Sequence, residues 1–316
     1  MQVISAEQVD AALDFPGRVD ALAAGFAAPF DMPPRQLLEL APDRGHDCLG
    51  LLPAWTDRLI ALKAFTYLPG NAAREKPVLH AQVLVFDRAD GRPLAQLEGR
   101  SLTRWRTAAV SALASRLLSR PDARRLLLLG TGELAAPLVQ AHLCVRPLDE
   151  VLIWGRRPAQ AQARIEALRA RGCMARLAVA EDLQRAQQSA DIIVAATGSG
   201  EPLVFGDLVP PGCHVDLLGN HRPDQRECDS ALVQQALIYV DSRANALREA
   251  GELIIPMRQG LLDENQVLGE LADLCRAALP PERAPGSVTL FKSVGTALAD
   301  LLCAQRVLTR LGLIAP

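Results

Sequence analysis

Apolar and polar residues in the second half of the chain follow the pattern expected of buried strands that alternate with amphipathic helices. Residues 126–129 are four consecutive leucines, and the apolar residues after them recur with helical spacing. This succession predicts strands at 126–129, 151–154, 175–179 and 191–195, and helices at 133–144, 158–171 and 181–188. Short apolar runs follow at 215–218 and 237–240. Such alternation favours a parallel, doubly wound α/β sheet.

The first hundred residues show a different pattern, which predicts a smaller mixed α+β region. The expected elements are a helix at 5–14, extended runs at 36–40 and 49–52, and longer strands at 59–68 and 78–87. Ser5 and Gln8 fit a helix capping box. Asp90-Gly91 is a hairpin turn signal, so 93–97 is expected to return beside the preceding strand. This region should therefore be a largely antiparallel sheet with one or two helices.

The turn after the leucine run, Gly130-Thr131-Gly132-Glu133-Leu134-Ala135, matches the pattern G-x-G-x-x-A. In this pattern the first glycine permits a tight turn, the second lets the backbone approach a pyrophosphate, and a small third residue lets the helix pack on the strand. The helix N-terminus then offers free N–H groups to phosphates. An ordinary strand-to-helix turn is the alternative. Because a strand precedes the turn and a helix follows it, we expect a Rossmann-type dinucleotide site that uses residues 130–134.

Two further amphipathic helices flank the alternating region. One is predicted from residue 107, with Arg106 at its opening, and Pro121 ends it. The other is predicted from Thr289 to Leu311, with Phe291 and Val294 on its apolar stripe. We expect the last helix to return to the N-terminal region. The predicted division is a first domain at 1–112, a dinucleotide-binding domain at 113–290, and a C-terminal segment, 291–316, that rejoins the first domain.

The end of the second strand of the alternating region bears on the choice of cofactor. NAD-binding folds carry an acidic residue there, which binds the ribose 2′-hydroxyl. This chain has Arg156 and Arg157 instead, and a guanidinium binds a phosphate through two parallel hydrogen bonds. The arginines could equally be solvated residues at a helix start. We predict that NADP(H) is preferred over NAD(H). Thr197, Gly198 and Ser199, which follow the fourth strand, are further cofactor candidates, although a plain turn explains them nearly as well.

Composition excludes several classes of function. The net charge of −2 over 316 residues provides no basic surface for nucleic acid or for a membrane, and no apolar run is long enough to span a bilayer. The seven cysteines show no C-x-x-C pair and no metal-ligand spacing with histidine, so we expect no metal site. The N-terminus shows no secretory signal pattern, and widely spaced cysteines are typical of reduced thiols. We expect a cytoplasmic protein.

Four charged residues outside these patterns are candidates for chemistry, each with a structural alternative. Arg35 follows Pro33-Pro34, Lys63 interrupts an apolar strand, and Arg106 opens a predicted helix. Lys63 could face solvent, and Arg106 could be an exposed first-turn residue. Asp229 precedes a helical run, where a helix N-cap is its common use. An amino-acid or imino-acid substrate would need such cations for its carboxylate and a proton donor near the nicotinamide.

The surroundings of these residues resemble the ornithine cyclodeaminase/μ-crystallin family along nearly the whole chain. The N-terminal half carries the matching segments Met32-Pro33-Pro34-Arg35, Leu62-Lys63, Leu68-Pro69-Gly70-Asn71, Gly91-Arg92-Pro93-Leu94-Ala95 and Arg104-Trp105-Arg106-Thr107-Ala108-Ala109. The C-terminal half adds Pro211-Gly212-Cys213-His214-Val215, Arg226-Glu227-Cys228-Asp229, Gly251-Glu252-Leu253 and Phe291-Lys292-Ser293-Val294-Gly295.

This resemblance implies an NAD(P)-dependent enzyme with a split substrate-binding domain that also forms a homodimer. Arg35, Lys63 and Arg106 would bind the substrate carboxylate and polarise the reacting centre, and Asp229 would be the general acid or base. Thr107 and Val294 would join the cofactor contacts. The family includes ornithine cyclodeaminases, reductases of cyclic imino acids such as pyrroline-2-carboxylate, and alanine dehydrogenases, all of which transfer hydride at the substrate α-carbon. A μ-crystallin-like NADP(H)-binding protein without turnover is the non-enzymatic alternative.

The chain departs from the family pattern in two places. Gly219-Asn220-His221 stands where many relatives have Gly-Ala-Asp, which leaves the contacts over the nicotinamide open. Cys228 replaces a more frequent leucine beside Asp229, a change expected to affect packing alone. The arginines at 156 and 157 favour net reduction of a cyclic imine over cyclodeamination, because a cyclodeaminase recycles bound NAD within each turnover.

Overall fold

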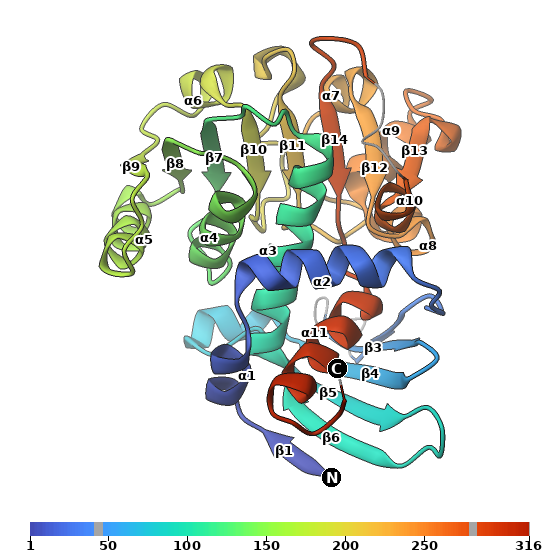
Figure 1. Cartoon of the computed structure of the whole chain (residues 1–316). Helices are drawn as coiled ribbons and strands as arrows, with labels where there is room; N and C mark the ends of the chain where they lie inside the picture. Colours follow the sequence, from blue (N-terminus) through green and yellow to red (C-terminus); the bar gives the residue numbers. More distant parts are fainter. Residues whose placement is uncertain (41–46, 278–282, 316) are drawn as a thin grey trace. The chain divides into compact units, whose positions relative to one another are not determined.

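The computed structural model describes residues 1–40, 47–277 and 283–315, and it divides into two compact units. Unit 1 comprises Met1–Thr107 and Thr296–Pro316, and unit 2 comprises Ala108–Gly295. Figure 1 labels the elements of both. The units divide at 107/108 and 295/296, whereas the sequence-based boundaries are 112/113 and 290/291. The first boundary falls inside helix α3 (Gly99–Leu118), whose apolar spacing continues across it.

Unit 2 is built on a parallel eight-stranded sheet with the strand order β13-β12-β14-β11-β10-β7-β8-β9. Its strands are β7 (Arg125–Leu129), β8 (Glu150–Trp154), β9 (Arg176–Val179), β10 (Ile192–Ala195), β11 (His214–Leu217), β12 (Leu237–Val240), β13 (Val267–Glu270) and β14 (Thr289–Lys292). Because the chain winds outward in both directions from β7, the strand order reverses between β7 and β10. Doubly wound sheets bind ligands at the carboxyl ends of the strands beside such a reversal.

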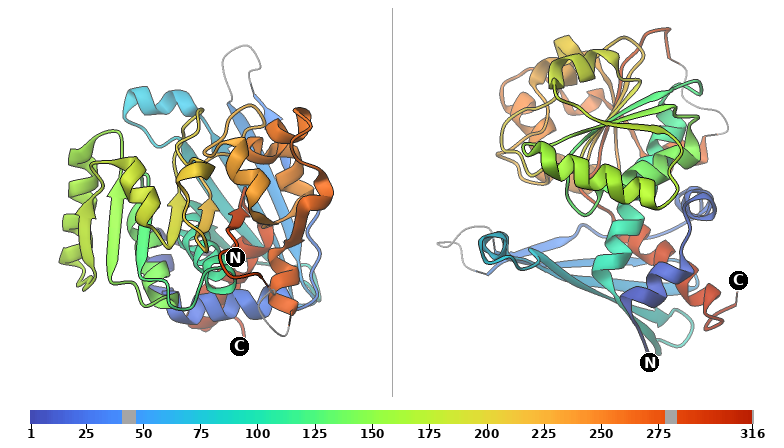
Figure 2. Two further views of the ribbon diagram at one scale, coloured as in Figure 1. Left: turned by 90° about the horizontal axis from the view of Figure 1, so that it is seen from above. Right: turned by 90° about the vertical axis from the view of Figure 1, so that its left-hand side faces the viewer.

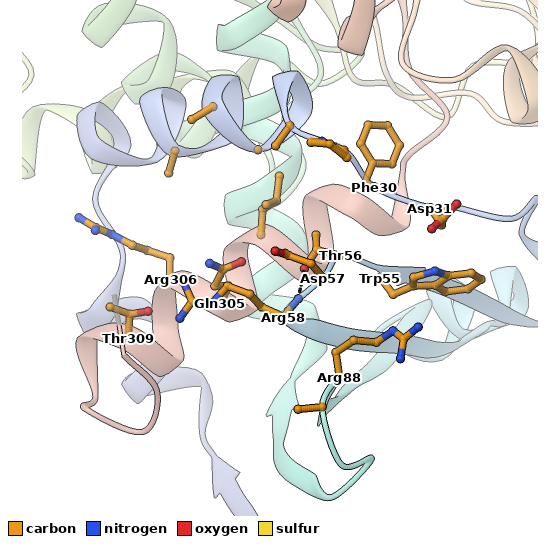
Figure 3. A pocket seen from close by; sticks show the side chains of 17 residues that line it. Phe30, Asp31, Trp55, Thr56, Asp57, Arg58, Arg88, Gln305, Arg306 and Thr309 are labelled. Atoms are coloured by element: carbon orange, nitrogen blue, oxygen red, sulfur yellow. Dashed lines mark hydrogen bonds between the residues drawn. The ribbon is translucent and has the colours of Figure 1, made fainter.

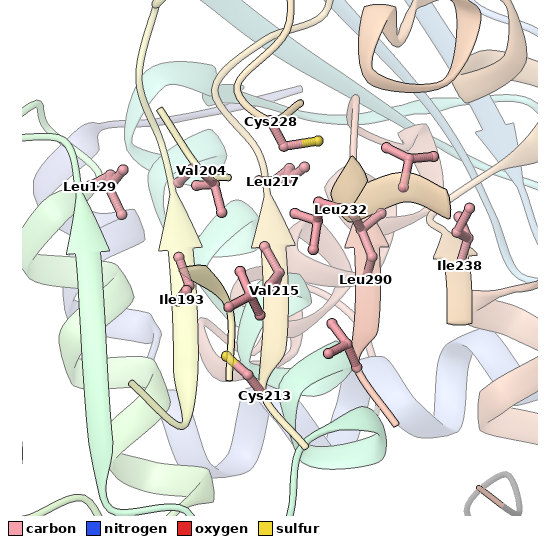
Figure 4. Packing of buried hydrophobic residues seen from close by; sticks show 14 of the residues in the cluster. Leu129, Ile193, Val204, Cys213, Val215, Leu217, Cys228, Leu232, Ile238 and Leu290 are labelled. Carbon is pink, nitrogen blue, oxygen red and sulfur yellow. The ribbon is translucent and has the colours of Figure 1, made fainter. Parts of the chain in front are cut away.

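Helices cover both faces of this sheet, as Figure 2 shows. They are α4 (Ala135–Val145), α5 (Pro158–Ala170), α6 (Leu183–Ser189), α7 (Ser230–Gln235), α8 (Arg243–Glu249), α9 (Gly251–Arg258) and α10 (Leu271–Arg276), with short 3₁₀ turns η3 (Gly206–Leu208) and η4 (Glu264–Gln266). One buried apolar cluster joins the central strands to the covering helices through residues such as Ile193, Val215, Leu217, Leu232 and Leu290 (Figure 4). This core makes the carboxyl edge of the sheet a firm support for ligand-binding loops.

Unit 1 is a six-stranded sheet with the order β1-β6-β5-β4-β3-β2. Its strands are β1 (Gln2–Ile4), β2 (Gln36–Glu39), β3 (Cys48–Trp55), β4 (Leu59–Tyr67), β5 (Leu79–Asp87) and β6 (Pro93–Glu98), and its helical elements are α1 (Ala6–Ala12), α2 (Phe15–Ala27), η2 (Pro69–Arg74), the first part of α3, and α11 (Ala297–Arg310). Strands β2 to β6 pair antiparallel, and β1 joins β6 in parallel. Helix α11 packs on β3, β4 and β5, so the end of the chain completes the first unit.

Most elements agree with the sequence predictions, including the capping box of α1, in which Ser5 and Gln8 exchange hydrogen bonds. The predicted helix from Thr289 is wrong in its first part. Thr289–Lys292 form the fully buried strand β14, and α11 begins only at Ala297. Gly295 has a φ of 98°, which a continuous helix does not allow. A four-residue apolar run is compatible with the period of a helix and with that of a strand, so spacing alone could not identify the strand.

Two other helices differ from expectation. Helix α3 begins at Gly99, ahead of the predicted start at 107, because the Glu98 carboxylate accepts hydrogen bonds from the N–H groups of Arg100 (2.9 Å) and Ser101 (2.7 Å). Helix α2 was not predicted. It is capped by the Asp14 carboxylate, which accepts from the N–H of Gly17 at 2.9 Å, and it buries the stripe Phe15, Val19, Leu22 and Phe26. Its proline and glycines concealed the helical signal.

Candidate functional site

The turn between β7 and α4 has the geometry that a dinucleotide requires. Gly130 has a φ of 122°, and a side chain there would place its Cβ 2.5 Å from the carbonyl oxygen of Ala196. Space is open where Gly132 would carry a Cβ, as the close approach of a phosphate to this backbone requires. Helix α4 begins after Leu134, whose side chain makes no capping hydrogen bond. Its first N–H groups can therefore bind an anion.

Neighbouring residues set the rest of this turn. Thr131 donates to Gln160 Oε1 at 3.2 Å, and its carbonyl accepts from Arg164 Nε at 2.9 Å, which ties the turn to α5. Ala135 is buried, as the small third position of the fingerprint requires, and Glu133 is exposed. These residues fit the pyrophosphate part of a nicotinamide dinucleotide.

Arg156 and Arg157 lie at the carboxyl end of β8, the strand next to β7. Both side chains are exposed. Arg157 is the N-cap residue of α5, and its side chain makes no capping hydrogen bond. No carboxylate occupies the end of β8, where a ribose 2′-hydroxyl would be bound in an NAD site. Two guanidinium groups at this point can bind a 2′-phosphate.

Glu227 ties together the loops that follow β10 and β11. Its side chain is fully buried, and Oε1 accepts from both the N–H and the Oγ1 of Thr197, each at 2.7 Å. Its Oε2 accepts from the N–H of Gly219, also at 2.7 Å. A Cβ on Gly219 would lie 2.0 Å from the Thr197 carbonyl oxygen, so the close approach of the two loops requires this glycine. Burial raises the pKa of Glu227 to about 7, although Lys292 acts to lower it.

A buried ion pair lies beneath these loops. Lys292 at the end of β14 contacts Glu252 Oε2 at 3.0 Å and donates to the carbonyl of Asn220 at 2.5 Å, and both charged side chains are fully buried. Glu252 Oε1 in turn accepts from the N–H of Glu227 at 3.1 Å. Asn220 donates to the carbonyl of Ser199 at 3.0 Å. The buried Lys292–Glu252 pair therefore holds the segment around Asn220 in place, and Asn220 in turn holds the segment around Ser199.

Val294 and Thr107 also have defined places. The N–H of Val294 donates to Asp241 Oδ2 at 3.0 Å, in a turn where Gly295 N–H binds the same oxygen at 2.6 Å. This turn follows β14 at the carboxyl edge of the sheet. Thr107 is half-buried in α3 and is the last residue of unit 1 before the chain enters unit 2.

Unit 1 contains a buried cationic cluster formed by Arg35, Lys63 and Arg106 around Asp300. Lys63 Nζ lies 3.2 Å from Asp300 Oδ1, and Arg106 Nε lies 3.3 Å from the same oxygen. Lys63 also donates to Thr103 Oγ1 at 2.7 Å. Arg35 lies near enough to act electrostatically on Lys63. None of the four charged side chains is more than 9% exposed.

Burial lowers the pKa of Lys63 to about 8; Asp300 opposes this shift, and the charges of Arg106 and Arg35 add to it. A lysine that titrates near neutral pH can both hold and release a proton, which is what a general acid must do. Lys63 and Arg106 share a single carboxylate oxygen, Asp300 Oδ1. The excess of positive charge favours the binding of one more anion.

Asp229 has a different environment. Its Oδ1 accepts from the N–H of Leu232 at 3.0 Å, which caps α7, and from the N–H of Gly206 at 3.0 Å. These contacts match the N-cap alternative that the sequence leaves open. Asp229 belongs to unit 2, whereas Arg35, Lys63 and Arg106 belong to unit 1. The structure therefore brings the three cations together, and the acid–base role of Asp229 stays a prediction.

Sequence reasoning missed Asp300, Glu227, Glu252 and Lys292. A signal existed for Asp300, because it shares a helix face with the buried residues Cys303, Ala304 and Val307. A carboxylate on the apolar face of a helix indicates a buried partner. Spacing gives no comparable signal for the other three, whose partners come from distant loops.

A pocket of about 1190 Å³ in unit 1 is a separate feature. It lies between α2, α11 and the turns of two hairpins, and Trp55, Arg58, Arg88 and Arg306 line it (Figure 3). No predicted site residue is among its described lining residues. Within the parts of the chain that the structure describes, no group of histidine, cysteine and acidic side chains could hold a metal ion, and no helix is long and apolar enough to cross a bilayer.

Comparisons with known proteins agree with this architecture. The chain is 44% identical over 314 residues to a Delta(1)-pyrroline-2-carboxylate reductase of Colwellia psychrerythraea, covering 98% of this chain and 99% of the relative. Its fold matches that of a Thermococcus litoralis reductase of the same name in complex with NADH and L-proline, with a TM-score of 0.92, 27% identity, and coverage of 98% and 97%.

A second solved structure is the iminosuccinate reductase of Paracoccus denitrificans in complex with NAD+, with a TM-score of 0.88, 28% identity, and coverage of 99% and 96%. The family model of the ornithine cyclodeaminase/mu-crystallin family matches residues 3–312. The resemblance seen in the sequence is confirmed, and the chain belongs to the ornithine cyclodeaminase/mu-crystallin family.

Proposed function

We propose that this protein is an NAD(P)-dependent oxidoreductase that reduces a cyclic imino acid of the pyrroline-2-carboxylate class to the cyclic amino acid. The observation that carries the proposal is the buried cationic cluster, in which Lys63 and Arg106 share one carboxylate oxygen of Asp300 and Arg35 lies near enough to act on Lys63. The dinucleotide geometry of the β7 turn supports it, as does the 44% identical relative that bears the reductase name. Ornithine cyclodeamination, which the sequence also suggested, has less support because that relative is named as a reductase.

The residues of the chain have distinct parts in this reaction. Arg35 and Arg106 bind the substrate carboxylate, since guanidinium groups pair with carboxylates through directed hydrogen bonds. Lys63 donates a proton to the imine nitrogen. The bound reduced nicotinamide supplies the hydride that the imine carbon accepts. The C=N bond becomes a C–N bond with one new C–H and one new N–H, so atoms and electrons balance.

We also propose that two copies of the chain associate through the open face of the unit 1 sheet. On β3, β4 and β5 most residues directed toward the helices are buried, whereas the alternate residues are half-buried or exposed. Leu49, Leu51, Leu62, Leu84 and Phe86 give this alternate face an apolar patch, and His80 and Gln82 are its exposed polar positions. An apolar patch bordered by polar residues is a typical contact surface between subunits.

None of the seven cysteines forms a disulfide, which supports the proposed cytoplasmic location.

The direct test of the proposed function is turnover. We expect the purified protein to oxidise NADPH or NADH when pyrroline-2-carboxylate is added, with formation of L-proline, and to convert L-ornithine far more slowly. Loss of absorbance from the reduced nicotinamide follows the reaction. If neither this imine nor its six-membered homologue is reduced while the cofactor still binds, a cofactor-binding protein without turnover becomes the better description.

The pKa of Lys63 predicts how kcat/KM for the imine depends on pH. Because the protonated form is required and burial lowers the pKa to about 8, kcat/KM for the imine should fall as pH rises through about 8. Lys63→Met should remove this dependence and lower kcat by about 10²–10⁴-fold, the usual contribution of a positioned acid. Lys76→Met, which removes an exposed lysine of unit 1, is the matched control. A wild-type profile that stays level well above pH 8 would contradict the role given to Lys63.

The capping contacts of Asp229 lead to a separate prediction. Asp229→Ala should lower the free energy of unfolding by about 1 kcal/mol, the usual loss for an N-cap. Asp229→Ser retains a capping oxygen but lacks the carboxylate, so it separates the two roles: capping alone keeps kcat within about threefold, whereas loss of an acid–base role lowers kcat by about 10²–10⁴-fold. Urea unfolding and steady-state kinetics measure both. A large loss of kcat in a stably folded Asp229→Ser variant would instead establish Asp229 as the acid or base.

We propose that NADP(H) is preferred over NAD(H), through Arg156 and Arg157, although the solved relatives hold NADH and NAD+. Arg156→Ala should raise KM for NADPH about tenfold, the effect of losing one charge-assisted hydrogen bond, and leave KM for NADH nearly unchanged. Arg171→Ala, at the other end of α5, is the control. A wild-type enzyme with a strong preference for NADH would overturn this assignment.

A further inference from the structure

One carboxylate oxygen connects two buried cations of unit 1. Asp300 Oδ1 lies 3.2 Å from Lys63 Nζ and 3.3 Å from Arg106 Nε. Lys63 belongs to β4, Arg106 to α3 and Asp300 to α11. The side chain of Asp300 is 1% exposed and that of Lys63 is 2% exposed, so water does not screen this contact. An interaction between charges is strongest where solvent is excluded.

Asp300 is also the anion that opposes the charges around Lys63. The charged groups that act on the Lys63 ammonium are Asp300 from α11, Arg106 from α3 and Arg35 from the segment before β2. The neutral Thr103 of α3 and the ring of Phe65, 5.9 Å away on the same strand, complete its described contacts. Without Asp300, two guanidinium groups would be the charged groups that act on the buried ammonium among the described residues. Buried cations in that situation lose their proton.

Some of the hydrogen-bonding capacity of this buried cluster is unused, which a purely structural ion pair would not require. Asp300 Oδ2 is buried and accepts no hydrogen bond from the described residues, and Arg106 Nε is buried without a hydrogen bond of good geometry. Thr103 Oγ1 donates to the carbonyl of Gly99 at 2.6 Å, which leaves its lone pair to orient Lys63. Lys63 therefore uses two of its three N–H groups in described contacts. Unsatisfied buried polar atoms beside an oriented donor are typical of a site that receives another polar group.

We propose that Asp300 is the positioning residue of the substrate site, because its bridging oxygen holds the Lys63 ammonium and the Arg106 guanidinium side by side as a proton donor and a carboxylate ligand. The catalytic part of this inference rests on the proposed function, whereas the charge coupling between Asp300 and Lys63 does not. Asp300 acts through Lys63 and Arg106. It lies near the start of α11, so the last helix of the chain supplies the counter-charge of a site whose cations lie in the first 107 residues.

The first experiment compares pH profiles. In Asp300→Asn, the midpoint of the fall in kcat/KM at high pH should move about one pH unit or more toward acid, the effect of removing an opposite charge at this distance. At pH values above both midpoints, kcat/KM should then be about tenfold lower for each pH unit that separates the two midpoints. Asp300→Glu should move the midpoint part of the way back, and Asp57→Asn, at an exposed carboxylate of unit 1, should leave the profile unchanged. If Asp300 had only a structural role, Asp300→Asn would lower kcat/KM by the same factor at all pH values.

The second experiment does not depend on turnover. The chain has only three lysines, Lys63, Lys76 and Lys292, so protein labelled with ¹³C-lysine gives few resonances, and Lys63→Met assigns one of them. The Lys63 titration should move to lower pH in Asp300→Asn and to higher pH in Arg106→Gln, which removes a neighbouring cation. The inference is overturned if neither variant moves the titration or if both move it in the same direction. If the titrations move as expected but no imine is reduced, the charge coupling stands and the proposed reaction fails.

Discussion

A lysine can be removed from water only if its charge is compensated, and this constraint organises unit 1. Lys63 lies on a strand between the apolar inward neighbours Ala61 and Phe65, and it remains a usable cation because α11 brings Asp300 within 3.2 Å. Along the chain, the whole of unit 2 lies between Lys63 and the helix that supplies its counter-charge. The order of the elements along the chain and the chemistry of the site depend on each other.

Unit 2 uses the same principle for a different purpose. Glu227, Glu252 and Lys292 are fully buried, and each binds backbone groups of the loops at the carboxyl edge of the sheet. In unit 1 the buried charges are left with a surplus of cations, whereas in unit 2 they are used to hold loops in place. The first arrangement favours an anionic ligand, and the second provides a rigid edge for a cofactor. A reductase of imino acids needs both.

The sequence was a good guide wherever the signal was local. The leucine run at 126–129 and the glycine turn after it predict β7 and its phosphate-binding geometry, because both depend on neighbouring residues. Local patterns failed where tertiary contacts decide the outcome. Thr289–Lys292 has an apolar spacing compatible with a helix, yet it pairs between β11 and β12 as a central strand. Lys63 and Asp300 are separated by 237 residues along the chain, so no spacing rule could have found their pairing.

The cationic cluster of unit 1 is proposed to bind the carboxylate of an imino acid or of its amino-acid product, and the rest of the mechanism depends on this contact. A crystal structure of the protein with L-proline and oxidised cofactor tests it most directly. We expect the proline carboxylate to pair with Arg35 and Arg106 and Lys63 Nζ to contact the ring nitrogen. Proline bound elsewhere, with the cluster around Asp300 left without a ligand, would contradict the proposed mechanism.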